Sequence, residues 1–109
     1  LSEAVSAAVT SHENQTFLST ASAWEISIKY ASGKLNLRQH PDRLIPKLRE
    51  ASNIYSLAID EESALLAGRL AQFHSDPFDR VLVAQAVVHG MTILTPDRNI
   101  EQYAVRVLW

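Results

Sequence analysis

Apolar residues along the chain follow two alternating patterns, short continuous runs and helical spacing. The short runs predict four strands, at residues 16–20, 53–59, 91–95 and 104–109. Helical spacing and favourable helix ends predict helical segments at residues 2–9, 22–33, 40–52, 61–73 and 76–90, with a turn or short helix at 96–103. Strands that alternate with helices indicate an α/β fold with a mainly parallel sheet.

The predicted helix ends carry residues that are favoured at such positions. Three residues are N-cap candidates, because their side chains can accept hydrogen bonds from free backbone N–H groups: Ser2, Asp60 and Asp76. Gly33 and Gly90 follow helical segments and are suited to end them. The boundaries of the 40–52 segment stay open, because it contains both Pro41 and Pro46.

Three acidic residues fall where an α/β fold gathers its ligands. Glu25 lies a few residues beyond the predicted strand 16–20, and Asp97 follows the strand 91–95. Asp79 lies in the first turn of the helix that leads into the strand 91–95. A helix in this topology runs antiparallel to its strands, so its first turn lies at their carboxyl ends. We therefore expect the three carboxylates to converge on one rim.

Converging carboxylates without a histidine partner are hard oxygen ligands, which suit Mg²⁺ or Mn²⁺. A divalent cation there would favour phosphodiester hydrolysis. Each acid also has a simpler interpretation: Glu25 can pair with Lys29 one helical turn later, Asp79 can serve the helix dipole, and Asp97 can be a turn residue after Pro96.

Length and composition fit a single domain over residues 1–109. Cysteine is absent, which excludes disulfides and thiolate metal sites and is compatible with a cytoplasmic location. No apolar run approaches the roughly 18 residues that a membrane span needs. The net charge of −2 excludes a uniformly basic nucleic-acid binder.

The charge is nevertheless uneven. The segment from Lys29 to Arg49 contains six basic residues, with Asp42 as its one acidic residue. This segment is either a solvated charged face or an anion-binding edge.

Three stretches, "STASAWEISIKYASGKL", "HSDPFDRVLVAQA" and "ILTPDRNIEQYAVRVLW", resemble PIN-domain proteins, and more narrowly the VapC-type toxins of toxin–antitoxin pairs. The resemblance implies a three-layer α/β/α fold with a mainly parallel sheet. It also implies a Mg²⁺- or Mn²⁺-dependent endoribonuclease that hydrolyses RNA phosphodiester bonds with a metal-activated water. The partners it implies are RNA, a cognate VapB-like or Phd-like antitoxin and commonly a second copy of the chain.

Carried over by position, the resemblance assigns three catalytic metal ligands: Glu25, Asp79 and Asp97. Thr95 matches a hydroxyl residue that orients a carboxylate or a water molecule. Arg80 and Arg98 stand beside two of the acids, either to contact phosphate or only to neutralise the rim. Asp76 is interpreted as an N-cap and not as a ligand, and His74 as a structural or incidental residue in preference to a general base.

The sequence departs from the family at its start. Family members begin with a strand that ends in an aspartate, the first acid of the site, and this strand is central in the sheet. No such strand occurs here, so we expect that residues preceding Leu1 supply it.

Two alternatives to a nuclease stay open. One is a catalytically incomplete PIN-like module that binds an antitoxin or RNA without cleaving. The other is a metal-dependent phosphatase or phosphoacceptor domain, for which Asp97 is the candidate nucleophile.

Overall fold

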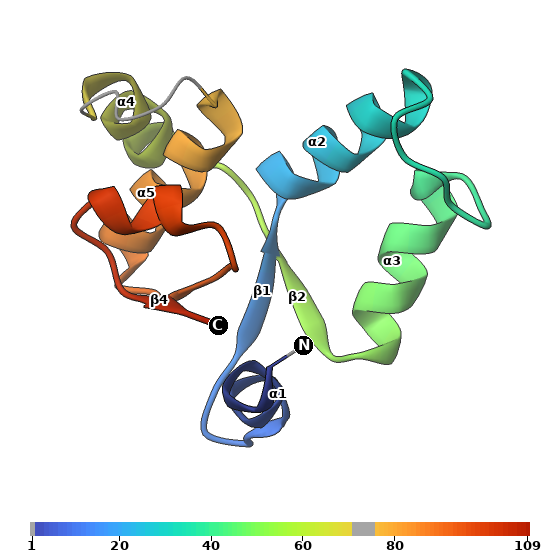
Figure 1. The fold of residues 1–109 in the computed structure, drawn as a ribbon, viewed down its shortest axis with the longest axis horizontal. Helices are drawn as coiled ribbons and strands as arrows, with labels where there is room; N and C mark the ends of the chain where they lie inside the picture. The colour runs from blue at the N-terminus through green and yellow to red at the C-terminus, as the bar shows by residue number, and fades with distance from the viewer. Residues whose placement is uncertain (1, 71–75) are drawn as a thin grey trace. The chain divides into compact units, whose positions relative to one another are not determined.

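The computed structural model describes residues 2–70 and 76–109, which form a mixed α/β structure with short parallel strands (Figure 1). In chain order, the described elements are α1 (Glu3–Thr10), β1 (Thr16–Ser19), α2 (Thr20–Ala31), α3 (Pro41–Ala51), β2 (Ile54–Leu57), α4 (Glu61–Arg69), α5 (Pro77–His89), β3 (Ile93–Leu94), the 3₁₀ helix η1 (Arg98–Gln102) and β4 (Val107–Leu108). Helices and strands follow one another in the predicted order. The α/β prediction is therefore confirmed.

The chain divides into two compact units. The first unit is formed from Leu1–Asn14 and Ile59–Trp109, and the second unit is Gln15–Ala58. Each unit contains one pair of parallel strands. The interpretation of residues 1–109 as a single domain stays a prediction.

The second unit is a strand–helix–helix–strand arrangement. Strands β1 and β2 are parallel, with Thr16 opposite Ile54 and Ser19 opposite Leu57, and α2 and α3 form the crossover between them (Figure 1). Parallel strands require such a crossover, because a tight turn cannot join them.

Helix α2 begins two residues earlier than predicted. The Ser19 hydroxyl accepts a hydrogen bond from the Ala21 N–H at 3.1 Å, so Ser19 is the N-cap and Thr20 is the first helical residue. At the other end, Gly33 has a φ of +77° just beyond the C-cap, a left-handed conformation that glycine adopts without steric cost. The predicted helix end is therefore confirmed.

Helix α3 tolerates both of its prolines. Pro41 occupies the first helical position, where its missing N–H has no intrahelical partner to lose. Nδ1 of His40 caps this end by accepting a hydrogen bond from the Asp42 N–H at 3.2 Å. Pro46 lies within the helix, where it removes one backbone donor without ending the helix.

The first unit is built around α4, α5 and the β3–β4 pair, in which Ile93 lies opposite Val107 and Leu94 opposite Leu108. Its core cluster consists of Val83 from α5 with Ile100 and Tyr103 from the segment after β3. Four half-buried apolar residues pack against this cluster: Leu70, Ile93, Val105 and Val107. The core therefore joins α5 to the chain that follows it.

The strands of the first unit are shorter than predicted. Only Ile93–Leu94 and Val107–Leu108 form ladder pairs, although Thr95 N–H also donates to the Leu108 carbonyl at 3.2 Å. Helix α4 ends at Arg69 with Leu70 as its C-cap, earlier than predicted, and residues 71–73 of its predicted range lie outside the described residues.

In the described part of the chain, β1 pairs with β2 and β3 pairs with β4. The central strand expected from residues before Leu1 stays a prediction. No helix among these residues combines the length and the apolar character that crossing a membrane requires.

Candidate functional site

Asp79 is held in the first turn of α5 by the cap that precedes it. The Asp76 carboxylate accepts hydrogen bonds from the N–H groups of Phe78 at 2.9 Å and Asp79 at 3.4 Å. Pro77 is the first helical residue, so Asp79 is the third. Asp79 is half-buried. The prediction that Asp76 is the N-cap is confirmed. The cap fixes the backbone of Asp79 without using the Asp79 carboxylate as the capping group.

Asp97 lies in the turn after β3. Its Oδ1 accepts a hydrogen bond from the Asn99 N–H at 2.9 Å and caps η1, and its own N–H donates to the Thr95 hydroxyl at 3.1 Å. The Thr95 side chain thus holds the backbone of Asp97 in place. These hydrogen bonds agree with the simpler interpretation of Asp97 as a turn residue. Asp97 is also exposed, so its carboxylate is accessible to a ligand.

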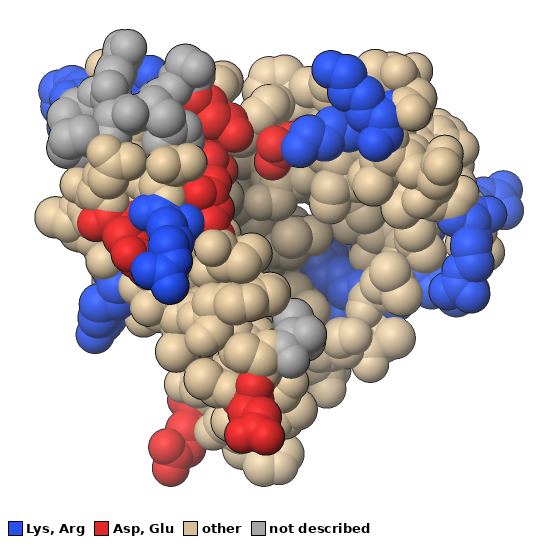
Figure 2. Space-filling model, in the orientation of Figure 1, with Lys and Arg blue, Asp and Glu red and all other residues tan. Residues whose placement is uncertain are grey.

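Asp79 and Asp97 belong to the same unit. Helix α5 contacts β3, and a short turn at residues 90–92 joins them. A 13-residue helix is about 20 Å long, and residues 93–97 span about 16 Å in extended form. These lengths are compatible with Asp97 lying near the first turn of α5. Figure 2 shows acidic side chains on the face of this unit that is turned to the viewer.

Glu25 lies on α2, in the second unit. Its Oε2 is 3.1 Å from Nζ of Lys29, one helical turn later, and its side chain is 25% exposed. The predicted pairing with Lys29 is therefore confirmed. Such a pair at a surface contributes only about 0.2–0.5 kcal/mol, so it is weak enough to open for a divalent cation.

Among residues 2–70 and 76–109, no three or more Asp, Glu, His or Cys side chains stand close enough to hold a metal ion. Glu25 belongs to the second unit, and Asp79 and Asp97 belong to the first. The three-carboxylate site stays a prediction. Its donors are nonetheless chemically suited to Mg²⁺ or Mn²⁺, because all of them are carboxylate oxygens.

The two arginines beside the acids differ in their surroundings. Nε and Nη2 of Arg80 donate to the Ala67 carbonyl at 3.3 and 3.2 Å, so this side chain fastens α5 to α4. Arg98 is exposed at the start of η1 and forms no ion pair with any described residue. Arg98 is thus the more accessible candidate for a phosphate contact. His74 lies outside the described residues.

The sequence did not indicate a polar cluster that joins α4 to α5. Oδ1 of Asp60 accepts a hydrogen bond from the Ser63 hydroxyl at 2.6 Å and lies 2.9 Å from Nε2 of His89. The Ser63 hydroxyl, followed by His89, holds the pKa of the Asp60 carboxyl well below its ordinary value. The sequence identified Asp60 as a cap, but nothing in the spacing pointed to His89, which is 29 residues away.

The sequence also did not indicate which residues of the basic segment from Lys29 to Arg49 line a pocket. Within the second unit, five residues line a cavity of about 260 Å³: Arg38, Gln39, Leu44, Lys47 and Leu48. The signal available in the sequence was the recurrence of Leu44, Lys47 and Leu48 three and four positions apart, which places them on one helix face.

Comparison with known protein families matches residues 1–106 to the PIN domain family. No curated protein and no solved structure matches the chain. The family match covers both units and all three predicted metal ligands.

Proposed function

Because the chain belongs to the PIN domain family, we propose that it is a metal-dependent endoribonuclease, the toxin of a toxin–antitoxin pair. PIN domains are nucleases in general, and the match over residues 1–106 is the observation that carries the proposal. RNA as the substrate and the toxin role rest on the VapC-like stretches of the sequence.

The proposed ligands of one or two Mg²⁺ or Mn²⁺ ions are Glu25, Asp79 and Asp97. When bound, such an ion stabilises charge on phosphoryl oxygens and lowers the pKa of a nearby water molecule. The chain itself positions the donors: the Asp76 cap fixes the turn that carries Asp79, and the Thr95 hydroxyl fixes the backbone of Asp97.

Arg98 is proposed to meet the phosphate of the substrate. It follows Asp97 directly and is exposed, and a guanidinium can donate two parallel hydrogen bonds to phosphate oxygens. Arg80 is assigned to the scaffold, because its donors are used on the Ala67 carbonyl.

As a toxin, the protein would be held inactive in the cytoplasm by a VapB-like or Phd-like antitoxin and would form a homodimer. Two apolar side chains on successive turns of α2 support a protein partner: Trp24 is 62% exposed and Ile28 is 44% exposed. Neighbouring exposed apolar residues of this size favour protein–protein contact.

The proposal is tested by replacing single carboxylates. In this protein, Asp79→Asn and Asp97→Asn are each expected to lower RNA cleavage with Mg²⁺ by at least about 100-fold, because a neutral amide is a poor ligand for a hard cation. The measurement is the initial rate on a labelled single-stranded RNA. Circular dichroism verifies that each variant is folded.

Asp42→Asn is the matched control, because Asp42 is exposed on α3 and contacts His40. This variant should cleave at the rate of the unmodified protein. If Asp79→Asn and Asp97→Asn also cleave at that rate, the nuclease site lies elsewhere and the assignment is wrong.

A further inference from the structure

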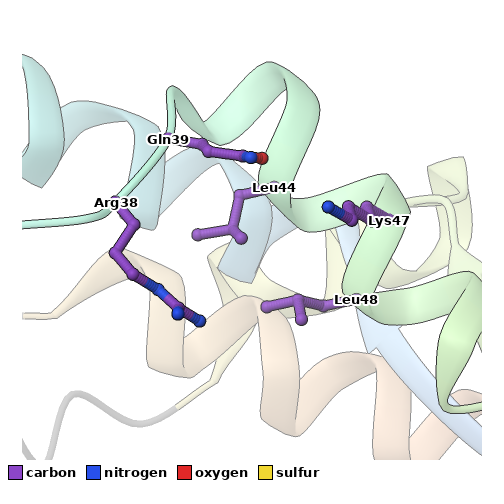
Figure 3. A pocket seen from close by; sticks show the side chains of 5 residues that line it. All are labelled: Arg38, Gln39, Leu44, Lys47 and Leu48. Atoms are coloured by element: carbon purple, nitrogen blue, oxygen red, sulfur yellow. The ribbon is translucent and has the colours of Figure 1, made fainter.

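The second unit carries a pocket that the proposed metal site does not use. Its volume is about 260 Å³. Figure 3 shows the side chains of Arg38 and Gln39, from the segment before α3, turned toward the same space as those of Leu44, Lys47 and Leu48 on α3. The pocket thus combines two cations, one amide and two apolar side chains.

The two cations of this pocket are not neutralised by carboxylates. Neither Arg38 nor Lys47 forms an ion pair with any residue that the structure describes, and no acidic residue lines the pocket. Lys29, by contrast, is paired with Glu25 at 3.1 Å. Two unpaired cations that share one hollow produce a positive potential there, which attracts an anion.

The size of the pocket favours a polymer over an enclosed small molecule. Pockets that bury small-molecule ligands commonly measure about 300–1,000 Å³, and this one is smaller and bordered by exposed side chains. A flexible chain can lay one unit into such a hollow and continue beyond it on both sides.

The chemistry of the lining fits the backbone of a nucleic acid. The planar guanidinium of Arg38 and the ammonium of Lys47 suit phosphate oxygens, and the Gln39 amide adds a neutral donor. Leu44 is half-buried and Leu48 is 52% exposed. Together they offer an apolar surface against which a ribose or a base can lie.

We propose that this pocket is a backbone-binding subsite for single-stranded RNA, in which Arg38 and Lys47 contact phosphates and Leu44 and Leu48 contact the adjoining nucleoside. The assignment rests on the proposed function, which supplies RNA as the polyanion. The subsite strengthens substrate binding and contributes no group to bond cleavage. It therefore affects KM and leaves kcat unchanged.

The test measures RNA binding by the protein. Asp79→Asn is introduced as the background so that the RNA stays intact, and a fluorescent ten-nucleotide single-stranded RNA is titrated at several salt concentrations. Arg38→Gln and Lys47→Gln are each expected to raise Kd by about tenfold, because each removes a charged hydrogen bond. Each should also lower the slope of log Kd against log salt by about 0.7, the value for one phosphate contact on a single strand.

Arg43→Gln is the matched control, because Arg43 is an exposed cation on α3 that does not line the pocket. Its Kd should stay within about twofold of the background. Equal values of Kd and salt slope for Arg38→Gln, Lys47→Gln and Arg43→Gln would overturn the subsite. Binding of polyglutamate is measured in the same way. If Arg38→Gln and Lys47→Gln abolish polyglutamate binding but leave RNA binding unchanged, the subsite is also overturned, because the pocket then binds an acidic protein segment.

A cleavage assay separates this proposal from the one on which it rests. With Asp79 intact, Arg38→Gln and Lys47→Gln should raise KM and retain kcat. If the unmodified protein cleaves RNA and these variants show an unchanged KM, only the subsite is wrong. If the unmodified protein neither binds nor cleaves RNA, both proposals fail.

Discussion

The Asp60 carboxylate links the beginning of α4 to the end of α5. It caps α4 through the N–H and the hydroxyl of Ser63, at 3.2 and 2.6 Å, and its Oδ1 lies 2.9 Å from Nε2 of His89, the last residue of α5. These contacts favour the ionised form, so the pKa of Asp60 lies below its ordinary value. The negative charge of Asp60 therefore contributes to the stability of the contact between α4 and α5.

This arrangement predicts a stability that depends on acid pH. A carboxyl group whose pKa is lower in the folded protein than in the unfolded chain stabilises the fold above its unfolded pKa, about 4 for aspartate. The stabilisation is lost as the pH falls below that value toward the folded pKa. Thermal unfolding should therefore show a difference in Tm between the unmodified protein and Asp60→Asn that is constant from pH 6 to about pH 4 and narrows as the pH falls from about 4 to 3.

Ser63→Ala provides the control for this prediction. It removes the hydrogen bond that lowers the pKa of Asp60 most, so its own acid sensitivity should be weaker than that of the unmodified protein. A Tm difference between the unmodified protein and Asp60→Asn that is the same at pH 3 and pH 6 would contradict the assignment.

Residue roles that depend on local sequence could be predicted, and those that depend on distant partners could not. Ser2, Asp60 and Asp76 are N-caps as expected, because a cap is determined by the two or three residues that follow it. Arg80 stands next to a predicted metal ligand, but its acceptor is the Ala67 carbonyl, 13 residues earlier. No periodicity in the sequence specifies such a contact.

At the scale of elements, the sequence predicts order and type better than length. The predicted strand 104–109 contributes only Val107–Leu108 to a ladder, because pairing depends on a neighbouring strand as well as on apolar character. Helix α3 continues through Pro46, since one lost hydrogen bond does not outweigh the remaining contacts of the helix. Helix ends set by glycine, in contrast, occur where they were expected.

Gly90 ends α5 in the left-handed region, with a φ of +67°. A Cβ at this position would meet no atom within 4 Å, so substitution there adds backbone strain without a clash. Gly90→Ala is therefore expected to lower the free energy of unfolding by about 1 kcal/mol, as measured by urea denaturation.

Gly68→Ala is the matched control, because Gly68 lies within α4 and its Cβ would also meet no atom within 4 Å. The same substitution should here raise the free energy of unfolding by about 0.5–1 kcal/mol, since alanine favours a helix. Equal effects of the two substitutions would show that the left-handed conformation of Gly90 is not what determines the result.

At the scale of the whole molecule, the match to the PIN domain family extends over both compact units. The match runs from residue 1 to residue 106 and so includes both units. The sequence could place Asp79 in the first turn of a helix and Asp97 just after a strand, because those positions follow from local patterns. It could not establish whether Glu25 meets Asp79 and Asp97, since that depends on how two separately packed units associate.

Paramagnetic Mn²⁺ can test this association directly. If the three carboxylates share one ion, sub-stoichiometric Mn²⁺ should broaden the backbone amide resonances around Glu25 in the second unit together with those around Asp79 and Asp97 in the first. Diamagnetic Mg²⁺ at the same concentration should shift these resonances without broadening them, and Asp79→Asn should reduce the broadening in both units, because a shared ion loses a ligand common to both. Broadening confined to one unit, or broadening around Glu25 that persists unchanged in Asp79→Asn, would mean that the acids bind cations separately and that the shared site does not form.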